Sequence, residues 1–244
     1  MNFSPFHFKR FSVLQKEVAH AVGTDGVLLG AWADLSDAHT ILDIGTGTGL
    51  IALMLAQRTE ADVRLTAIDV HAGSVACARR NFNNSPWKER LWVEKTSAQQ
   101  FAAACTSSFD LIVSNPPFFS ETTVSPVAER RLGRYAGSLT IDDLLNVVAR
   151  MLTPTGKCCI ILPAKEGKHL CELAVPMGLY CSLEVQVRGR AGKPVERLLL
   201  QLERNPGRFR REELAIYGEA GQYSPEFAEL VEGFYLGAGA ASGK

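Results

Sequence analysis

The sequence predicts an α/β fold: a mostly parallel, seven-stranded sheet with an antiparallel last strand and helices on both faces. Three observations support this prediction. Short apolar runs alternate along the chain with segments whose apolar residues recur at helical spacing. A glycine-rich turn at 45–49 joins the first core strand to a helix, which is the arrangement of nucleotide-binding folds. No helical pattern separates the runs 179–187 and 197–203, and neighbouring strands joined without a helix are usually antiparallel.

The predicted elements follow one another in regular order. Seven apolar runs are predicted strands, at 40–44, 63–68, 91–95, 109–113, 157–162, 179–187 and 197–203. Helices are predicted at 50–57, 73–83, 141–152 and 166–176. Expected helix caps are Thr24 or Asp25, Thr140, and Ser224 before Pro225. In an open sheet of this kind the first and fourth strands lie side by side, and ligands bind there, outside the carboxyl ends of the strands.

The composition is that of a soluble globular protein. The chain has 244 residues, of which 46% are hydrophobic and 21% charged. We expect one domain over 1–236 and a flexible, low-complexity tail over 237–244. No apolar run reaches the length of a membrane span, and the N-terminus has no signal-peptide core, so the expected location is the cytoplasm, without a membrane partner.

Cysteine and histidine spacing argues against a metal centre. The six cysteines form no C-x-x-C pair, and the five histidines are scattered without ligand spacing. We therefore predict no metal and no redox motif. The formal net charge is zero, which argues against indiscriminate binding of nucleic acid.

An Asn-Pro-Pro-aromatic motif follows the predicted fourth strand, at Asn115, Pro116, Pro117 and Phe118. The side-chain carbonyl of Asn115 and the backbone carbonyl of Pro116 can accept both hydrogens of a planar amine. The two prolines fix φ and hold that geometry rigid. The ring of Phe118 can stack on the flat group that carries the amine. The motif therefore predicts methyl transfer to an exocyclic or amide NH2; the alternative is a Pro-Pro turn that only ends a strand.

The glycine-rich turn predicts a cofactor site. Gly45, Gly47 and Gly49 allow positive φ and a close approach of the backbone to a ligand. The dinucleotide-binding motif has its third glycine at the position of Leu50. This departure argues against binding of a dinucleotide pyrophosphate and favours binding of S-adenosylmethionine (SAM). Asp69 lies 20 residues after Gly49, where an acid at a strand end would accept from both ribose hydroxyls. Asp43, just upstream of the turn, completes the part of the cofactor site that the residues themselves predict.

Basic residues gather in two segments of the chain. Eight lie between Arg188 and Arg211, where only two acids occur, and another group follows the Asn-Pro-Pro-Phe motif. Brought to one face, they would form a phosphate-binding surface for RNA. An ordinary solvated surface is an equally good interpretation. The residues predicted to contact RNA are Arg130, Arg134, Arg188, Arg190, Lys193, Arg208, Arg210 and Arg211.

The sequence resembles the class I SAM-dependent methyltransferases, which have a Rossmann-like fold. Within them it looks like the bacterial family that methylates adenine 37, beside the anticodon, in a valine tRNA. The resemblance runs nearly end to end. It is carried by Val22-Gly23-Thr24-Asp25-Gly26, Leu42-Asp43-Ile44-Gly45, Asn84-Ser85-Pro86-Trp87 and Ser114-Asn115-Pro116-Pro117-Phe118.

This resemblance implies adenine-N6 methylation of tRNA with SAM as cofactor, in a single domain that we expect to be a monomer. It also implies that residues 1–39, with Thr24 and Asp25, cover the cofactor. The other residues that it implies for the cofactor site are Thr46, Val70, Ser97, Ala98 and Asn115. One departure concerns the end of the third strand, where many relatives have Asp to bind the adenine amine of SAM and this chain has Ser97. Three alternatives remain: methylation of a glutamine amide in a protein, methylation of guanine N2 in ribosomal RNA, and a SAM-binding module without catalysis.

Overall fold

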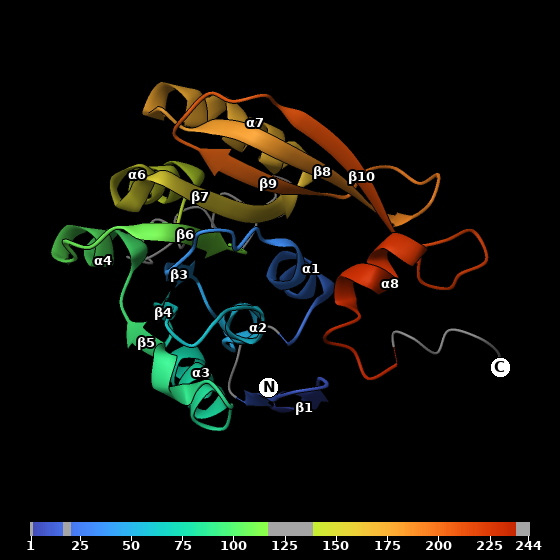
Figure 1. The fold of residues 1–244 in the computed structure, drawn as a ribbon, viewed down its shortest axis with the longest axis horizontal. Helices are drawn as coiled ribbons and strands as arrows, with labels where there is room; N and C mark the ends of the chain where they lie inside the picture. Colours follow the sequence, from blue (N-terminus) through green and yellow to red (C-terminus); the bar gives the residue numbers. More distant parts are fainter. Residues whose placement is uncertain (1, 17–20, 117–138, 238–244) are drawn as a thin grey trace, which may run out of the picture.

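A central sheet of eight strands organises the molecule, which the computed structural model describes over residues 2–16, 21–116 and 139–237 (Figure 1). The order across the sheet is β10-β8-β9-β7-β6-β3-β4-β5. All neighbours are parallel except β9, which runs antiparallel to both β7 and β8. The strands are β3 (Thr40–Ile44), β4 (Arg64–Asp69), β5 (Leu91–Lys95), β6 (Phe109–Ser114), β7 (Leu152–Pro163), β8 (Tyr180–Arg190), β9 (Arg197–Glu203) and β10 (Arg210–Tyr217).

The predicted α/β class, the seven predicted strands and the antiparallel pairing of β9 are confirmed. Two details differ. Strand β7 begins at Leu152 rather than at Lys157, because Leu152 pairs with Phe109 across an irregularity in the β6–β7 ladder. The predicted total of seven is one strand short, because β10 adds an eighth, parallel to β8, at the sheet edge. Only Leu214 of β10 is fully buried, so the strand lacks the apolar pattern of the inner strands.

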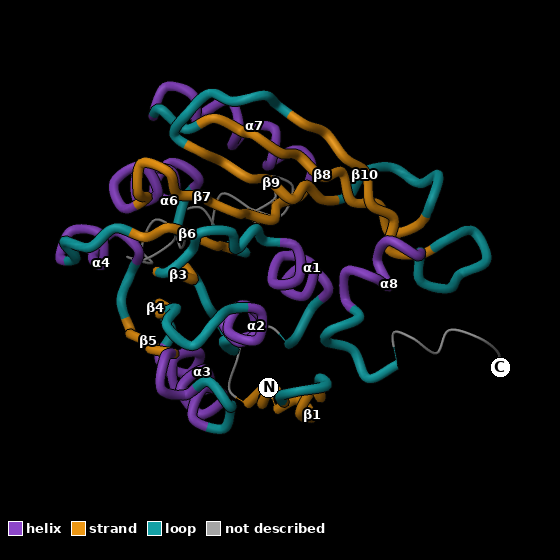
Figure 2. Tube along the Cα trace, viewed as in Figure 1, coloured by secondary structure: helices purple, strands orange, loops and turns teal. Residues whose placement is uncertain are grey.

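Helices cover both faces of the sheet and bury two separate apolar cores (Figure 2). One face carries α1, α2, α3 and α8, and the other carries α4, α6 and α7. The helices are α1 (Thr24–Trp32), α2 (Leu50–Arg58), α3 (Ala72–Asn83), α4 (Ala98–Ala104), α6 (Ile141–Met151), α7 (Ala164–Ala174) and α8 (Pro225–Val231), with 3-10 turns at Lys88–Arg90 and Val175–Met177. No helix in the described ranges is both long and apolar enough to cross a membrane.

Two of the three expected helix caps are confirmed. The side chains of Thr140 and Asp143 form a reciprocal capping box at the start of α6. Ser224 accepts a hydrogen bond from the backbone N–H of Phe227, with Pro225 in the first turn of α8. The expected cap of α1 was wrong: the N-cap is Gly23, and no side chain caps that helix.

An N-terminal segment packs against a segment near the C-terminus. A hairpin of β1 (Asn2–His7) and β2 (Ser12–Lys16) precedes α1. The ring of Phe8 stacks on Phe11, with centroids 4.6 Å apart, and on Tyr235 at 6.0 Å. The backbone N–H of Lys9 donates to the carbonyl of Phe234. The predicted tail over 237–244 lies, from residue 238 onward, outside the described residues.

Candidate active site

The glycine-rich turn leaves β3 at the carboxyl edge of the sheet and leads into α2. Gly45, Gly47 and Gly49 all have positive φ, at 76°, 57° and 82°, which only glycine adopts without strain. A Cβ on Gly45 or Gly47 would meet no atom within 4 Å, whereas one on Gly49 would lie 2.5 Å from a ring carbon of Phe82. Gly49 is therefore required for packing, and the first two glycines leave open space for a ligand.

Asp69 links the end of β4 to this turn. Its Oδ2 accepts from the backbone N–H of Gly47 at 2.9 Å, and its Oδ1 accepts from the N–H of His71 at 2.8 Å. The side chain is only 8% exposed, yet each carboxylate oxygen keeps a lone pair that a ribose hydroxyl can use. The next residue, Val70, is 36% exposed and offers an apolar surface beside Asp69.

Asp43 is buried under the turn with one oxygen unsatisfied. It is 1% exposed, and its Oδ2 accepts from the hydroxyl of Thr46 at 2.6 Å. Its Oδ1 has no hydrogen-bonding partner in the described part of the chain. Burial raises the pKa of Asp43 to about 7, and the charge of Asp69 adds to the rise, while the Thr46 hydroxyl and the Ala52 backbone N–H oppose it. A buried carboxylate with one unsatisfied oxygen is a favourable neighbour for a cation.

These features fit SAM. Its methionine part carries a cationic sulfonium and suits a turn that has open space beside Gly45 and Gly47 and follows the buried carboxyl of Asp43. Its ribose hydroxyls suit Asp69. Its adenine suits an apolar contact with Val70. Each requirement of the cofactor therefore has a residue of matching chemistry at the carboxyl edge of β3 and β4.

Ser97 and Ala98 lie at the carboxyl end of β5, beside Asp69. The backbone N–H of Thr96 donates to the carbonyl of Asp69. The hydroxyl of Ser97 accepts from the backbone N–H of Gln100 at 3.1 Å and caps α4, a role that the sequence analysis did not assign to it. Ala98 is buried.

The Asn-Pro-Pro-Phe motif, which the sequence predicts to bind an amine, follows β6, the strand next to β3 and its glycine turn. Ile44, the last residue of β3, is paired with Ser114, the last residue of β6. The fully buried Ser114 donates its hydroxyl to the carbonyl of Ile44 at 2.9 Å. Asn115 follows, half-buried, and Pro116 is buried. Pro117, Phe118, Arg130 and Arg134 lie outside the described residues.

Thr24 and Asp25 reach the same edge from the N-terminal side. Asp25 pairs with Arg197 of β9, whose Nε donates to its Oδ2 at 2.9 Å. Arg197 in turn is level with Pro163, the end of β7. A Cβ on Gly26 would lie 3.1 Å from Leu50, so the first turn of α1 packs directly against the start of α2. Thr24 and Asp25 therefore lie near the glycine turn.

The basic residues of the C-terminal third divide between two ends of the sheet. Val187 of β8 is level with Pro163, the carboxyl end of β7. Arg190 comes three residues later, and Lys193 lies in the turn that follows, so both lie beyond the carboxyl ends of the strands. In contrast, Arg208 lies in the connection that leaves β9 at Glu203, opposite Lys157, toward the amino ends of the strands. Basic residues that are close in sequence therefore do not all lie at the same end of the sheet.

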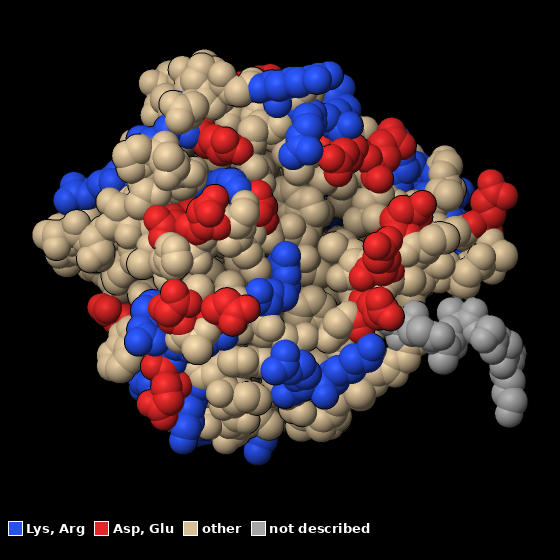
Figure 3. Space-filling view, viewed as in Figure 1, with Lys and Arg blue, Asp and Glu red and all other residues tan. Residues whose placement is uncertain are grey.

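Some of these cations have local partners. Arg188 pairs with Glu213 at 3.3 Å, and Arg211 pairs with Glu184 at 2.8 Å. Arg190, Lys193, Arg208 and Arg210 are exposed, and none has an ion pair among the residues that the structure describes. On the face drawn in Figure 3, acidic side chains lie among the basic ones, so this view shows no uninterrupted basic patch.

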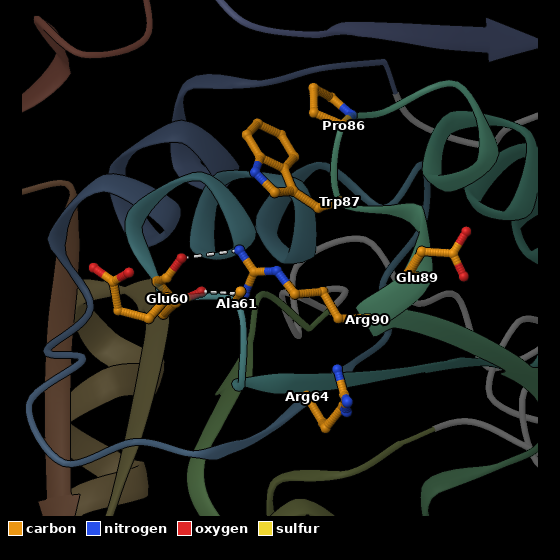
Figure 4. Close-up of a pocket in the computed structure, with 8 residues that line it drawn as sticks. Glu60, Ala61, Arg64, Pro86, Trp87, Glu89 and Arg90 are labelled. Carbon is orange, nitrogen blue, oxygen red and sulfur yellow. Dashed lines mark hydrogen bonds between the residues drawn. The ribbon is translucent and has the colours of Figure 1, made fainter.

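A separate pocket of about 330 Å³ lies away from the cofactor turn, between the end of α2 and the loop before β5. Arg90 is one of the lining residues and donates to the carbonyl and hydroxyl of Thr59, the C-cap of α2, at 2.9 and 2.8 Å (Figure 4). Its pKa is lowered, chiefly by burial. In the described ranges, no three His, Cys, Asp or Glu side chains form a group that could hold a metal ion.

Sequence reasoning missed two buried polar residues at the site. Ser114 ties β6 to β3, and Asn81 of α3 contacts the glycine turn at Thr48. Both lie in segments that read as ordinary strand and helix. Their position could have been suspected only because a polar residue stands where the apolar period expects a core residue.

Comparison with known proteins shows the family to which the chain belongs. Residues 23–169 match the family model "Methyltransferase small domain". A tRNA1(Val) (adenine(37)-N6)-methyltransferase from Yersinia pseudotuberculosis (strain YPIII) is 42% identical over 231 residues, covering 95% of this chain and 92% of the relative. The protein of the same name from Yersinia enterocolitica is also 42% identical over 231 residues, with the same coverage.

Solved structures with low sequence identity share the fold. A predicted O-methyltransferase from Agrobacterium tumefaciens has a TM-score of 0.65 at 17% identity and covers 86% of this chain and 96% of that one. A glycopeptide N-methyltransferase in complex with SAM has a TM-score of 0.54 at 13% identity and covers 77% of this chain and 98% of that one. The chain therefore belongs to the methyltransferase small domain family and, within it, to the family of the tRNA1(Val) (adenine(37)-N6)-methyltransferases.

Proposed function

We propose that this protein transfers the methyl group of SAM to N6 of adenine 37 in tRNA1(Val). One observation carries the proposal at the site: the glycine turn and Asn115 leave adjacent strands, because Ile44 is paired with Ser114. A methyl donor held along the turn and an amine held at Asn115 would then meet across one strand spacing. The family relationship supports the choice of nucleic acid and position.

Holding the amine is the main task of the chain's own residues. The N6 lone pair of adenine is delocalised into the ring, so the nitrogen is a poor nucleophile. The side-chain carbonyl of Asn115 and the backbone carbonyl of Pro116 would each accept one N6 hydrogen. These contacts favour a more tetrahedral nitrogen and stabilise the positive charge that develops on it during attack. SAM supplies a methyl group activated by its sulfonium. The proton on N6 can leave to water after transfer, so no strong general base is needed.

Positioning should supply much of the rate. Bringing a nitrogen and a methyl group into line can contribute up to roughly 7–11 kcal/mol in the best cases. The buried Ser114 hydroxyl bond to Ile44 helps here, because it fixes the residue before Asn115 to the residue before Gly45. A loop adenine is already single-stranded, so turning it out of its stack costs less than in a duplex.

Exposed cations would hold the tRNA backbone. We propose Arg188, Arg190, Lys193, Arg208, Arg210 and Arg211 as phosphate contacts. Arg190 and Lys193 have the stronger case, because they extend beyond the carboxyl edge, where Asn115 also lies, and have no local ion pair among the described residues. Arg188 and Arg211 are partly neutralised by Glu213 and Glu184. A tRNA substrate also implies work in the cytoplasm.

The test is the identity of the methylated product. Purified protein with SAM is offered total tRNA, total ribosomal RNA and release factors, and the products are digested and analysed by mass spectrometry. We expect N6-methyladenosine at position 37 of tRNA1(Val), and its loss from tRNA of a strain that lacks the protein. Methylated guanine in ribosomal RNA or methylated glutamine would overturn the proposal. So would SAM binding without transfer to any substrate.

A further inference from the structure

A buried amide on α3 joins the N-terminal hairpin to the cofactor turn. Asn81 is 1% exposed. Its Oδ1 accepts from the backbone N–H of Leu14 in β2 at 2.8 Å, and its Nδ2 donates to the Leu14 carbonyl at 3.1 Å. The same Nδ2 donates to the carbonyl of Thr48 at 2.8 Å. One side chain therefore satisfies three main-chain groups on two segments that are far apart in sequence.

On the turn side, this bond fixes the orientation of a loose peptide. Thr48 stands between Gly47 and Gly49, and both glycines have positive φ. Glycine has the largest conformational freedom of any residue, so a turn of this composition costs entropy to order. The bond from Asn81 to the Thr48 carbonyl limits that freedom in advance. A ligand that needs the turn in this shape then has less ordering to do when it binds.

On the hairpin side, Asn81 pairs with Leu14 as the peptide of a neighbouring strand would. The hairpin is also tied to the chain that enters α1: Gln15, 6% exposed, donates to the carbonyl of Ser4 at 2.6 Å and accepts from the N–H of Val22 at 2.5 Å. Asn81 thus lies between the cofactor turn and the hairpin that precedes Thr24 and Asp25.

We propose that Asn81 is a positioning residue that couples SAM binding to the anchoring of the N-terminal hairpin. It contacts neither the cofactor nor the amine. Coupling of this kind is reciprocal: an anchored hairpin strengthens SAM binding, and SAM, by stiffening the turn, strengthens the hold on Leu14. The inference rests on SAM binding at the glycine turn, which belongs to the proposed function, but not on the identity of the RNA.

The amide of Leu14 gives a direct test in the unaltered chain. Hydrogen exchange of this amide is measured with and without saturating SAM and in the absence of RNA, while calorimetry confirms that SAM is bound. We expect SAM to slow exchange of the Leu14 amide. If SAM binds and the exchange rate does not change, the coupling does not exist. Failure of tRNA methylation leaves both readouts intact, so it would count only against the proposed substrate.

Variants separate coupling from simple stability. Asn81→Ala removes all three bonds and should weaken SAM binding by about tenfold, which is the value of one good hydrogen bond. The exchange of Leu14 should then no longer respond to SAM, and the methylation rate at saturating SAM should stay near normal. Ser85→Ala is the matched control, because Ser85 is also buried, at 7% exposed, but among the described residues its hydroxyl bonds only to the nearby backbone of Phe82 and Trp87. Equal losses of SAM affinity in the two variants would overturn the assignment.

Discussion

The backbone N–H of Gly47 donates to Oδ2 of Asp69 across 2.9 Å, between the turn after β3 and the end of β4. The carboxylate assigned to the ribose therefore also holds the glycine turn. A substitution of Asp69 would therefore have two effects: it would release the Gly47 peptide and remove the proposed contact with the ribose.

Asp69→Ala should weaken SAM binding strongly. A charge-assisted hydrogen bond is worth roughly 1.5–3 kcal/mol, so the dissociation constant should rise about ten- to hundredfold. Calorimetry with SAM measures the effect directly. Asp62→Ala, which removes an exposed acid just before the same strand, serves as the control and should bind SAM normally. Unchanged affinity in Asp69→Ala would refute the assignment of this carboxylate.

Asp43 should make stability depend on pH. Its pKa is about 7 in the folded protein and about 4 in an unfolded chain, so the native state binds the extra proton between these values. The free energy of unfolding should therefore fall as pH rises from about 4 to about 7 and then level off. Urea unfolding without SAM measures this. Asp43→Asn should flatten the profile; an unchanged slope in that variant would show that another group titrates.

The same carboxyl should make SAM binding depend on pH in the opposite sense. Only the ionised form of Asp43 attracts the cationic cofactor, so SAM affinity should rise as pH increases through about 7. Calorimetry at a series of pH values measures the dissociation constant. Asp43→Asn supplies the reference, in which the affinity should no longer follow pH over this range. A pH-independent affinity in the unaltered chain would contradict the prediction.

Asn115→Ala should impair the chemical step more than binding. Its proposed carbonyl contact strengthens as N6 gains positive charge, so it acts mainly in the transition state. Loss of one preorganised polar group lowers a rate on the order of 10²–10³-fold. Single-turnover kinetics on tRNA1(Val) with unmodified adenine 37 gives the rate, and calorimetry should show nearly normal SAM affinity. Asn84→Ala, which removes an exposed amide, is the control. A near-normal rate in Asn115→Ala would rule out this mechanism.

The two groups of cations should differ in their effect on RNA binding. Replacing Arg190 and Lys193 by Gln should weaken tRNA binding and reduce its salt dependence, by about one unit of slope for each phosphate that is no longer neutralised. Replacing Arg208 and Arg210 should have a smaller effect, because the segment that contains Arg208 starts from the amino ends of the strands. Binding titrations at several salt concentrations measure both, and SAM affinity should not change. Equal effects from the two pairs would argue for a tRNA footprint that spans the sheet edge.

The sequence by itself determined the inner strands and the glycine turn, and it predicted that Asp69 and Asn115 stand at strand ends beside this turn. These features carry local signals: apolar runs mark buried strands, and glycines mark a turn with positive φ. The general winding of such sheets predicts that the first and fourth core strands are neighbours. The pairing of Ile44 with Ser114 confirms this, so the glycine turn and Asn115 leave adjacent strands, as the sequence predicted.

Only the tertiary structure showed the strand at one edge of the sheet and the hydrogen bonds between distant segments. Strand β10 begins with four exposed residues, Arg210 to Glu213, and exposed edge strands lack the apolar period by which a strand is recognised. The links from Asn81 to Leu14 and Thr48, and from Asp69 to Gly47, join segments from different parts of the chain. The spacing of apolar residues shows which residues are buried within one element. A hydrogen bond from a side chain to a distant backbone group leaves no mark on that spacing, so the sequence does not predict it. The tertiary structure also divides the basic residues between the two ends of the strands. Strand β9 is antiparallel to its neighbours, so the residues before it lie at their carboxyl ends and the residues after it lie at their amino ends.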